Sequence, residues 1–206
     1  MTRVLNDCRL LPHRFALHVP SATAVLADVH LGYSAARQRL GDAVPNRTVA
    51  EELLSLHDAA QTNEIRALVV AGDIFEKGFD PLLYQQFIAV LAALDIKLLG
   101  LVPGNHDRGI DAVAQDVPLF AEGYDLAGWR IVHGDQPSAW QRSIAGHWHP
   151  AVRFQRRKVP CFLVKDEQLI LPAFSLDAAG VDVGADPRWR EWQRYAIWGD
   201  DVIHVN

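Results

Sequence analysis

Continuous apolar runs alternate with amphipathic segments in the first half of the chain. Runs rich in small and β-branched residues predict buried strands over 22–27, 66–71 and 96–102. Helical spacing of apolar residues follows Thr48, which forms a capping-box pattern with Glu51. Asp80 and Pro81 predict the start of another helix. This alternation favours a parallel sheet covered by helices.

The second half has shorter apolar runs joined by tight polar turns. They predict strands over 129–133, 143–146, 158–164 and 168–171, with a closing hairpin of 195–198 and 202–205. An α/β half followed by a β-rich half predicts an α/β (α+β) fold in which two mixed β-sheets pack together with helices outside. No linker, repeat or low-complexity run divides the 206 residues, so we expect a single domain over 1–206.

Chemically active side chains follow five of the predicted strands. The motifs are Asp28-Val29-His30, Gly72-Asp73, Gly104-Asn105-His106-Asp107, His133-Gly134 and Gly146-His147-Trp148-His149. Each motif alone is more often an ordinary strand-end turn, so the interpretation depends on the whole set. Ligands of open α/β sheets bind outside the carboxyl ends of the strands, so we expect these side chains to share one rim.

The donor types in these motifs indicate a metal centre. Carboxylate, imidazole and carboxamide groups without thiolates suit Mn²⁺, Fe or Zn²⁺ better than Ca²⁺ or an iron–sulfur cluster. The candidate ligands are Asp28, His30, Asp73, Asn105, His133, His147 and His149. These are too many for one tetrahedral ion, so the set predicts two ions. Two neighbouring ions can activate water and polarise a phosphoryl group, which is the chemistry of phosphate-ester hydrolysis.

In this order the motifs resemble those of the calcineurin-like metallophosphoesterases, over about residues 24–149. The resemblance implies a four-layer αββα sandwich and a dimetal site, with Mn²⁺ expected and Fe or Zn²⁺ as alternatives. The implied roles are the first metal for Asp28, His30 and His149, a bridge for Asp73, and the second metal for Asn105, His133 and His147. His106 is implied as the general acid or phosphate contact, with Asp107 orienting its ring.

Further stretches are similar to one bacterial subfamily, the ligase-associated DNA-damage-response phosphoesterases and endonucleases (PdeM-like). They cover residues 26–33, 146–152, 159–162 and 171–175. The resemblance implies a nucleic-acid or nucleotide-like phosphodiester substrate, DNA end processing in repair, and association with a DNA ligase and a helicase. The basic side chains of Arg153, Arg156, Arg157 and Lys158 either contact substrate phosphates or form a solvated hairpin tip.

Composition changes this interpretation only slightly. The net charge of −5 argues against binding to nucleic acid by bulk charge alone. Cys8 and Cys161 lie in no metal or redox motif, and no apolar segment approaches membrane-spanning length, so we expect a cytoplasmic protein without a membrane segment. We expect the tryptophans at 189, 192 and 198 to pack the closing hairpin on the core; a base-stacking platform is the alternative.

Two other functions are compatible with the motifs. The same residues serve nucleotide or nucleotide-lipid pyrophosphatases and phosphomonoesterases. A non-catalytic scaffold that keeps the fold is a third interpretation, but such a protein has no need for His106 together with all seven candidate ligands. The leading hypothesis is a metal-dependent phosphodiesterase or nuclease.

Overall fold

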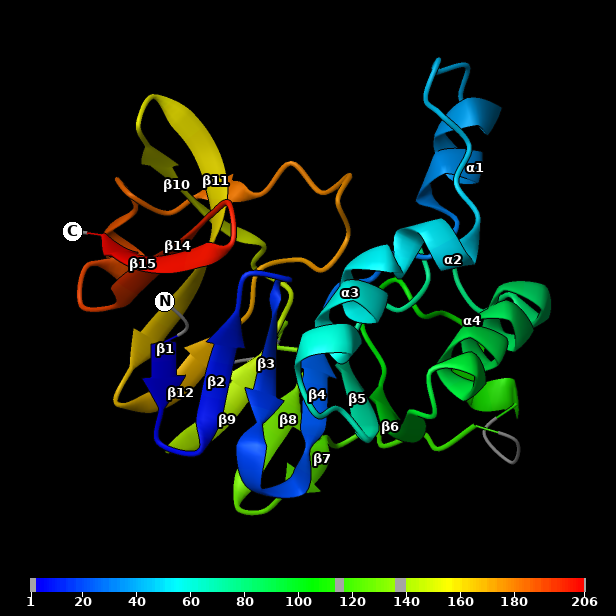
Figure 1. Cartoon of the computed structure of the whole chain (residues 1–206). Helices are drawn as coiled ribbons and strands as arrows, with labels where there is room; N and C mark the ends of the chain where they lie inside the picture. Colours follow the sequence, from blue (N-terminus) through cyan, green and yellow to red (C-terminus); the bar gives the residue numbers. More distant parts are fainter. Residues whose placement is uncertain (1–2, 114–116, 136–139, 206) are drawn as a thin grey trace.

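Two β-sheets packed face to face form the centre of the molecule (Figure 1). The computed structural model describes residues 3–113, 117–135 and 140–205. Three of the four α-helices of these residues, those within 49–93, pack their apolar faces against the outer surface of the first sheet, while the helix over 33–39 lies farther from it. The predicted class, two mixed sheets with flanking helices, is confirmed.

The first sheet has six strands in the order β1-β2-β3-β4-β5-β6. They are β1 Arg3–Leu5, β2 Cys8–Leu11, β3 Phe15–His18, β4 Thr23–Leu26, β5 Ala67–Ala71 and β6 Lys97–Val102. The three strands predicted in the first half are confirmed as β4, β5 and β6, which are parallel. Strands β1 to β3 add an antiparallel meander that the sequence pattern did not predict. Its turns use Asn6 and Arg14 at positive φ, so they lack the glycine that usually marks such turns.

The described residues form four helices, two of which begin where the sequence predicts, after Thr48 and at Pro81, while the helix over 33–39 is an addition. They are α1 Tyr33–Arg39, α2 Val49–Glu52, α3 Leu54–Thr62 and α4 Pro81–Ala93, with 3₁₀ turns η1 Val19–Ser21, η2 Ile110–Val113 and η3 Pro187–Trp189. Thr48 and Glu51 form the predicted capping box, and Asp80 Oδ1 accepts from the amides of Leu82 and Leu83. The single helix expected after Thr48 is instead divided at Leu53, whose ψ of 7° interrupts the helical backbone.

The second sheet has nine strands, seven of them in the order β13-β10-β11-β12-β9-β8-β7, with β14 paired to β11 and β15 paired to β14. They are β7 Tyr124–Leu126, β8 Trp129–Val132, β9 Arg142–Ala145, β10 Pro150–Phe154, β11 Arg157–Lys165, β12 Glu167–Ile170, β13 Val181–Asp182, β14 Gln193–Trp198 and β15 Asp201–Val205. The predicted strands and the closing hairpin are confirmed, while β7, β10 and β13 are additions. Strands β8, β9 and β12 run parallel.

Side chains of the second sheet point alternately to its two faces, and each face contributes to an apolar cluster. Ile131, Ile144 and Leu169 face the first sheet and are fully buried in the core between the sheets. Burial of each such side chain contributes about 1.5–3 kcal/mol. On the opposite face of this sheet, Trp189 of the turn η3 is buried in a separate apolar cluster. Among the described helices, none has the length and apolarity that crossing a bilayer requires.

Candidate metal centre

The seven candidate ligands lie in loops at the ends of strands of both sheets. Asp28 and His30 follow β4, Asp73 follows β5, and Asn105 follows β6. The remaining ligands come from the second sheet: His133 follows β8, and His147 and His149 lie between β9 and β10. Packing of the two sheets brings these loops together, and side-chain contacts of 3.9 Å or less link all seven ligands into one cluster.

The backbone of this cluster is held in an uncommon conformation. Five of the seven ligands have positive φ: Asp28 at 55°, His30 at 52°, Asp73 at 48°, His147 at 70° and His149 at 43°. A left-handed conformation costs a non-glycine residue about 1–2 kcal/mol. Such residues collect at functional sites, where the surrounding structure holds them in place. The fold therefore loses some stability in holding these side chains in their orientations.

Glycines in the motifs make room for the ligands. A Cβ on Gly104 would lie 2.1 Å from Oδ1 of Asp73, and one on Gly72 would lie 1.9 Å from Nδ1 of His133. Gly72 also has a φ of +89°. Only glycine fits at these two positions, because any side chain would occupy the space of a candidate ligand.

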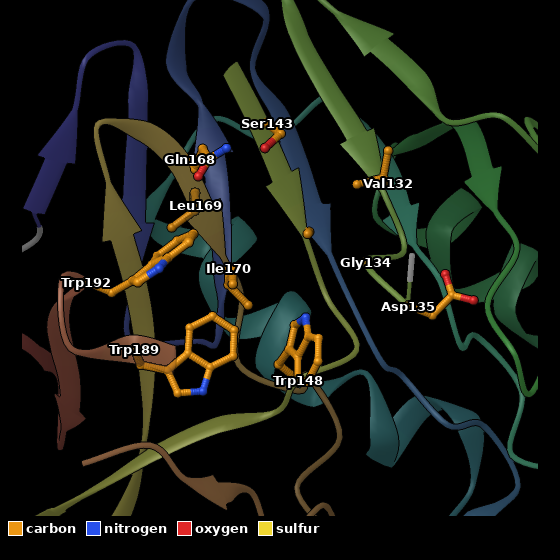
Figure 2. A pocket seen from close by; sticks show the side chains of 11 residues that line it. Val132, Gly134, Asp135, Ser143, Trp148, Gln168, Leu169, Ile170, Trp189 and Trp192 are labelled. Carbon is orange, nitrogen blue, oxygen red and sulfur yellow. The ribbon is translucent and has the colours of Figure 1, made fainter. Parts of the chain in front are cut away.

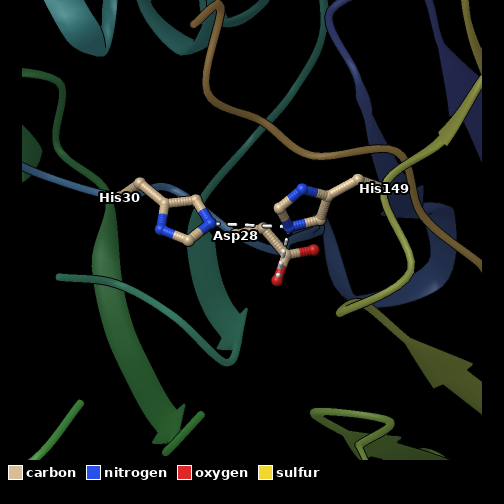
Figure 3. A group of neighbouring side chains, drawn as sticks. All are labelled: Asp28, His30 and His149. Atoms are coloured by element: carbon tan, nitrogen blue, oxygen red, sulfur yellow. Dashed lines mark hydrogen bonds and ion pairs between the residues drawn. The ribbon is translucent and has the colours of Figure 1, made fainter. Parts of the chain in front are cut away.

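The first group of donors is Asp28, His30 and His149 (Figure 3). One ligand atom from each lies within 4.8 Å of the others. The Nε2 atoms of the two histidines are 3.4 Å apart, and Nε2 of His149 is 3.5 Å from Oδ1 of the fully buried Asp28. Burial lowers the pKa of His149, but the Asp28 carboxylate, aided by Asp73 and Glu76, outweighs burial and raises it. The site therefore favours positive charge at this position.

The second group is Asp73, His133 and His147. Nε2 of His133 is the central atom: it lies 3.1 Å from Nδ1 of His147, 3.6 Å from Oδ2 of Asp73 and 3.1 Å from Oδ1 of Asn105. Burial, together with the neighbouring His133, lowers the pKa of His147. A neutral imidazole has a free lone pair, which is the form that binds a metal.

The arrangement of both groups fits bound cations. Two pairs of imidazole nitrogens face each other at 3.1 and 3.4 Å, where a cation can accept lone pairs from both members of a pair. Within the described ranges, Asp28 and Asp73 form ion pairs with histidines only, so no lysine or arginine neutralises these buried carboxylates. Buried carboxylates need a counter-charge, and two divalent ions held by these residues would supply it.

Glu76 joins the site although the sequence patterns did not single it out. Its Oε2 lies 3.0 Å from Nδ1 of His30, and its backbone oxygen lies 2.8 Å from Nδ1 of His106. With these two histidines it forms a further group of donors. Its position three residues after Asp73 was the only available signal, and a lone glutamate in a loop is usually solvent-exposed.

His106 and Asp107 lie beside the second group, but Asp107 contacts the backbone. Its Oδ1 accepts from the amide of Phe75 at 2.9 Å, and its Oδ2 accepts from that of Gly104 at 2.8 Å. Burial and the Asp73 charge raise the pKa of Asp107 against these amide bonds, which lower it. Nδ1 of His106 contacts the Glu76 carbonyl oxygen and not the expected Asp107. Through its two amide contacts, Asp107 instead fixes the loop that carries His106.

The basic residues predicted after the last motif lie on the β10–β11 hairpin. All four are exposed: Arg153, Arg156, Arg157 and Lys158. Arg153 pairs with Asp182 at 3.2 Å, and Lys158 donates to the Gly180 carbonyl at 3.2 Å. Arg156 and Arg157 stand at the turn of this hairpin, which projects from the sandwich (Figure 1). None of the four contacts the seven candidate ligands within the described part of the chain.

Comparisons with known proteins agree with this geometry. The sequence model of the family described as calcineurin-like phosphoesterase matches residues 22–154, more than half of the chain. The crystal structure of Pseudomonas putida nuclease MPE is similar over 100% of both chains, with a TM-score of 0.76 and 21% sequence identity. No curated protein matches at a significant level. The protein belongs to the calcineurin-like phosphoesterase family and is a metal-dependent phosphoesterase.

Proposed function

We propose that this protein hydrolyses phosphodiester bonds at a centre of two divalent metal ions, acting on DNA ends during repair. The observation that carries the proposal is the juxtaposition of two donor groups with His106. The first group includes His30, whose ring lies 5.1 Å from that of His106, and the second includes Asp73, which accepts from the His106 amide. A phosphate held by both groups would therefore lie beside an imidazole.

The metal ligands follow from the two groups. Asp28, His30 and His149 would hold one ion, and Asn105, His133 and His147 would hold the other. Asp73 would bridge them. When bound, the ions supply Lewis-acid activation of phosphate and of water at neutral pH. Mn²⁺ is the proposed metal, with Fe and Zn²⁺ as alternatives, because mixed oxygen and nitrogen donors suit all three.

His106 is the proposed general acid. A backbone carbonyl only accepts hydrogen bonds, so the contact with Glu76 O requires the proton of the neutral ring to be on Nδ1. Nε2 is then the atom that takes up a proton and donates it to the leaving oxygen. Asp107 holds the backbone of this loop through Gly104 and Phe75, which keeps the ring in place.

Two features support a polymeric phosphodiester as the substrate. The similar Pseudomonas putida protein is a nuclease. The exposed Arg156 and Arg157 offer cations for a phosphate backbone that extends beyond the metal centre. The proposed role in DNA repair, with ligase and helicase association, rests on the resemblance to the ligase-associated subfamily.

The test is hydrolysis of bis(4-nitrophenyl) phosphate by the protein loaded with Mn²⁺. His106→Ala should lower kcat by about 100-fold or more, as loss of a general acid does. Asp73→Asn should lower it at least as far, and a chelator should abolish it. Asp166→Asn is a matched control, because Asp166 is an exposed aspartate that also has positive φ. Unchanged turnover in the Asp73 and His106 variants would contradict the proposal.

A panel of substrates tests the class of ester. DNA with 3′-blocked or 5′-blocked ends should be cleaved with a higher kcat/KM than phosphomonoesters or pyrophosphates. A preference for nucleotide pyrophosphates would instead assign the same centre to a pyrophosphatase.

A further inference from the structure

A pocket of about 370 Å³ lies on the outer face of the second sheet, beside the metal centre (Figure 2). Its floor follows from strand alternation. Ile131, Ile144 and Leu169 point inward to the core, so their neighbours Val132, Ala145 and Ile170 point outward. Ser143 and Gln168 are paired one step along the same strands and face the same way. Because Ser143 and Ala145 are small, the middle of this floor is hollow.

Three tryptophans form one wall of the pocket. The rings of Trp148 and Trp189 meet edge to face at 5.3 Å, and those of Trp189 and Trp192 meet in the same way at 5.6 Å. Trp189 is buried, whereas Trp148 and Trp192 remain partly exposed at the pocket. Arg188 lies over the Trp148 ring at 5.0 Å from its centroid. The wall therefore presents aromatic surface next to the guanidinium of Arg188, which is paired with Asp186.

Trp148 connects this pocket directly to the metal centre. It stands between His147 and His149 in the chain, and its ring lies 5.3 Å from the His147 ring. Gly134 lines the other side of the pocket and follows His133. In a nucleotide only the sugar separates the base from the phosphate. A phosphate at the second donor group therefore places its own base within reach of the pocket.

The pocket also has polar groups that suit a heterocycle. Ser143 lines the pocket, and its hydroxyl can both donate and accept a hydrogen bond. Gln168 donates to the Trp140 carbonyl, which leaves its side-chain oxygen as an acceptor. The edge of a base carries donors and acceptors that could pair with these two side chains, whereas a purely apolar ligand carries none.

We propose that this tryptophan-lined pocket binds a nucleobase of the substrate, adjacent to the scissile phosphate. The inference rests on the proposed phosphodiesterase function and gives it a nucleotide preference. Bases stack on aromatic side chains largely independently of sequence, so the pocket would accept any DNA end.

The first test compares two substrates that share a leaving group. They are thymidine 5′-(4-nitrophenyl phosphate) and the same diester with an abasic sugar. The wild-type protein should favour the thymidine ester about 10-fold in kcat/KM. Trp192→Leu should reduce that ratio towards one, and Ala145→Val should do so by filling the floor. Trp198→Leu is the matched control, because Trp198 packs on Phe154 and does not line the pocket.

The second test measures binding without metal or turnover. Thymidine should quench the tryptophan fluorescence of the metal-free protein saturably, and Trp192→Leu should weaken that binding about 5-fold or more while Trp198→Leu does not. Circular dichroism establishes that each variant is folded. Hydrolysis of bis(4-nitrophenyl) phosphate with a substrate ratio near one and no quenching would overturn this inference and leave the proposed function intact. Saturable quenching without any diester hydrolysis would support the base pocket and contradict the proposed function.

Discussion

The backbone amide of His106 donates a 2.8 Å hydrogen bond to Oδ1 of Asp73. The other carboxylate oxygen, Oδ2, faces Nε2 of His133 at 3.6 Å. One buried carboxylate therefore contacts both the loop of the proposed acid and His133, its neighbour in the second donor group. Its orientation is fixed by these contacts, so a change at Asp73 disturbs His106 as well as the ligands.

Gly104→Ala should inactivate the enzyme without unfolding it. The new Cβ would lie 2.1 Å from Oδ1 of Asp73 and 2.4 Å from its backbone nitrogen, so both the carboxylate and the backbone of Asp73 must move. We expect a loss of about 100-fold in kcat for bis(4-nitrophenyl) phosphate, because displaced ligands misplace the reacting groups.

Gly109→Ala provides the control for that substitution. Gly109 has a φ of +81°, but a Cβ at this position would meet no atom within 4 Å, so alanine there causes backbone strain of about 1 kcal/mol without a clash. Its activity should stay within about 2-fold of wild type. Equal losses in both variants would show that any substitution in this loop, and not the space beside Asp73, is responsible.

Glu76 should strengthen metal binding through His30. Its carboxylate lies 3.0 Å from Nδ1 of His30, close enough to orient the ring for binding a metal through Nε2. Glu76→Ala should weaken Mn²⁺ affinity about 10- to 100-fold in isothermal titration calorimetry, and Glu76→Gln should have a smaller effect. Glu191→Gln, at an exposed site paired with Lys165, should leave the affinity unchanged. Wild-type affinity in Glu76→Ala would rule out this role.

Strand ends were the informative feature of the sequence. Asp28 and Asp73 each follow a buried apolar run, so their convergence could be predicted from the rule that parallel strands end at one edge. The paired histidines 147 and 149 were found by their spacing. Glu76 was missed because its partners are distant in sequence and its residue type is common in loops. The contacts of Asp107 with the Phe75 and Gly104 amides were not predicted, since backbone amides leave no sequence signal.

The missed parts of the fold have similar causes. The β1–β3 meander turns at Asn6 and Arg14, where non-glycine residues adopt positive φ, so no turn motif marks it. The break between α2 and α3 at Leu53 leaves the apolar spacing intact. Tertiary packing decides both features, and local residue patterns do not record it.

Glu52 should make stability depend on pH. Burial, reinforced by the Asp177 charge, raises the pKa of Glu52 to about 7 from its ordinary value of 4.5. The folded state therefore binds more protons than the unfolded state between these values, so the free energy of unfolding falls as pH rises from 4.5 to about 7. Glu52→Gln should remove about 1–2 kcal/mol of that fall in urea titrations.

Glu64→Gln controls for the loss of a carboxylate, because the Glu64 side chain is 67% exposed. It should keep the wild-type pH profile. A Glu52→Gln protein with the same fall as wild type would show that Glu52 is ionised at the same pH in both states.

Arg156 and Arg157 of the β10–β11 hairpin should affect the hydrolysis of long substrates only. Arg156→Gln with Arg157→Gln removes two exposed cations, so the slope of log(kcat/KM) against log[salt] for DNA should become shallower by about 1–2. Turnover of bis(4-nitrophenyl) phosphate should not change. Arg66→Gln, another exposed arginine that pairs with Glu64, serves as the control. An unchanged salt slope would show that Arg156 and Arg157 do not contact the DNA backbone.

The most direct test of the account is anomalous diffraction at the manganese edge from crystals grown with Mn²⁺. Two peaks should appear, one among Asp28, His30 and His149 and one among Asn105, His133 and His147, with Asp73 contacting both. Density elsewhere, or an empty cluster in crystals of protein that hydrolyses phosphodiesters, would contradict the two-metal centre.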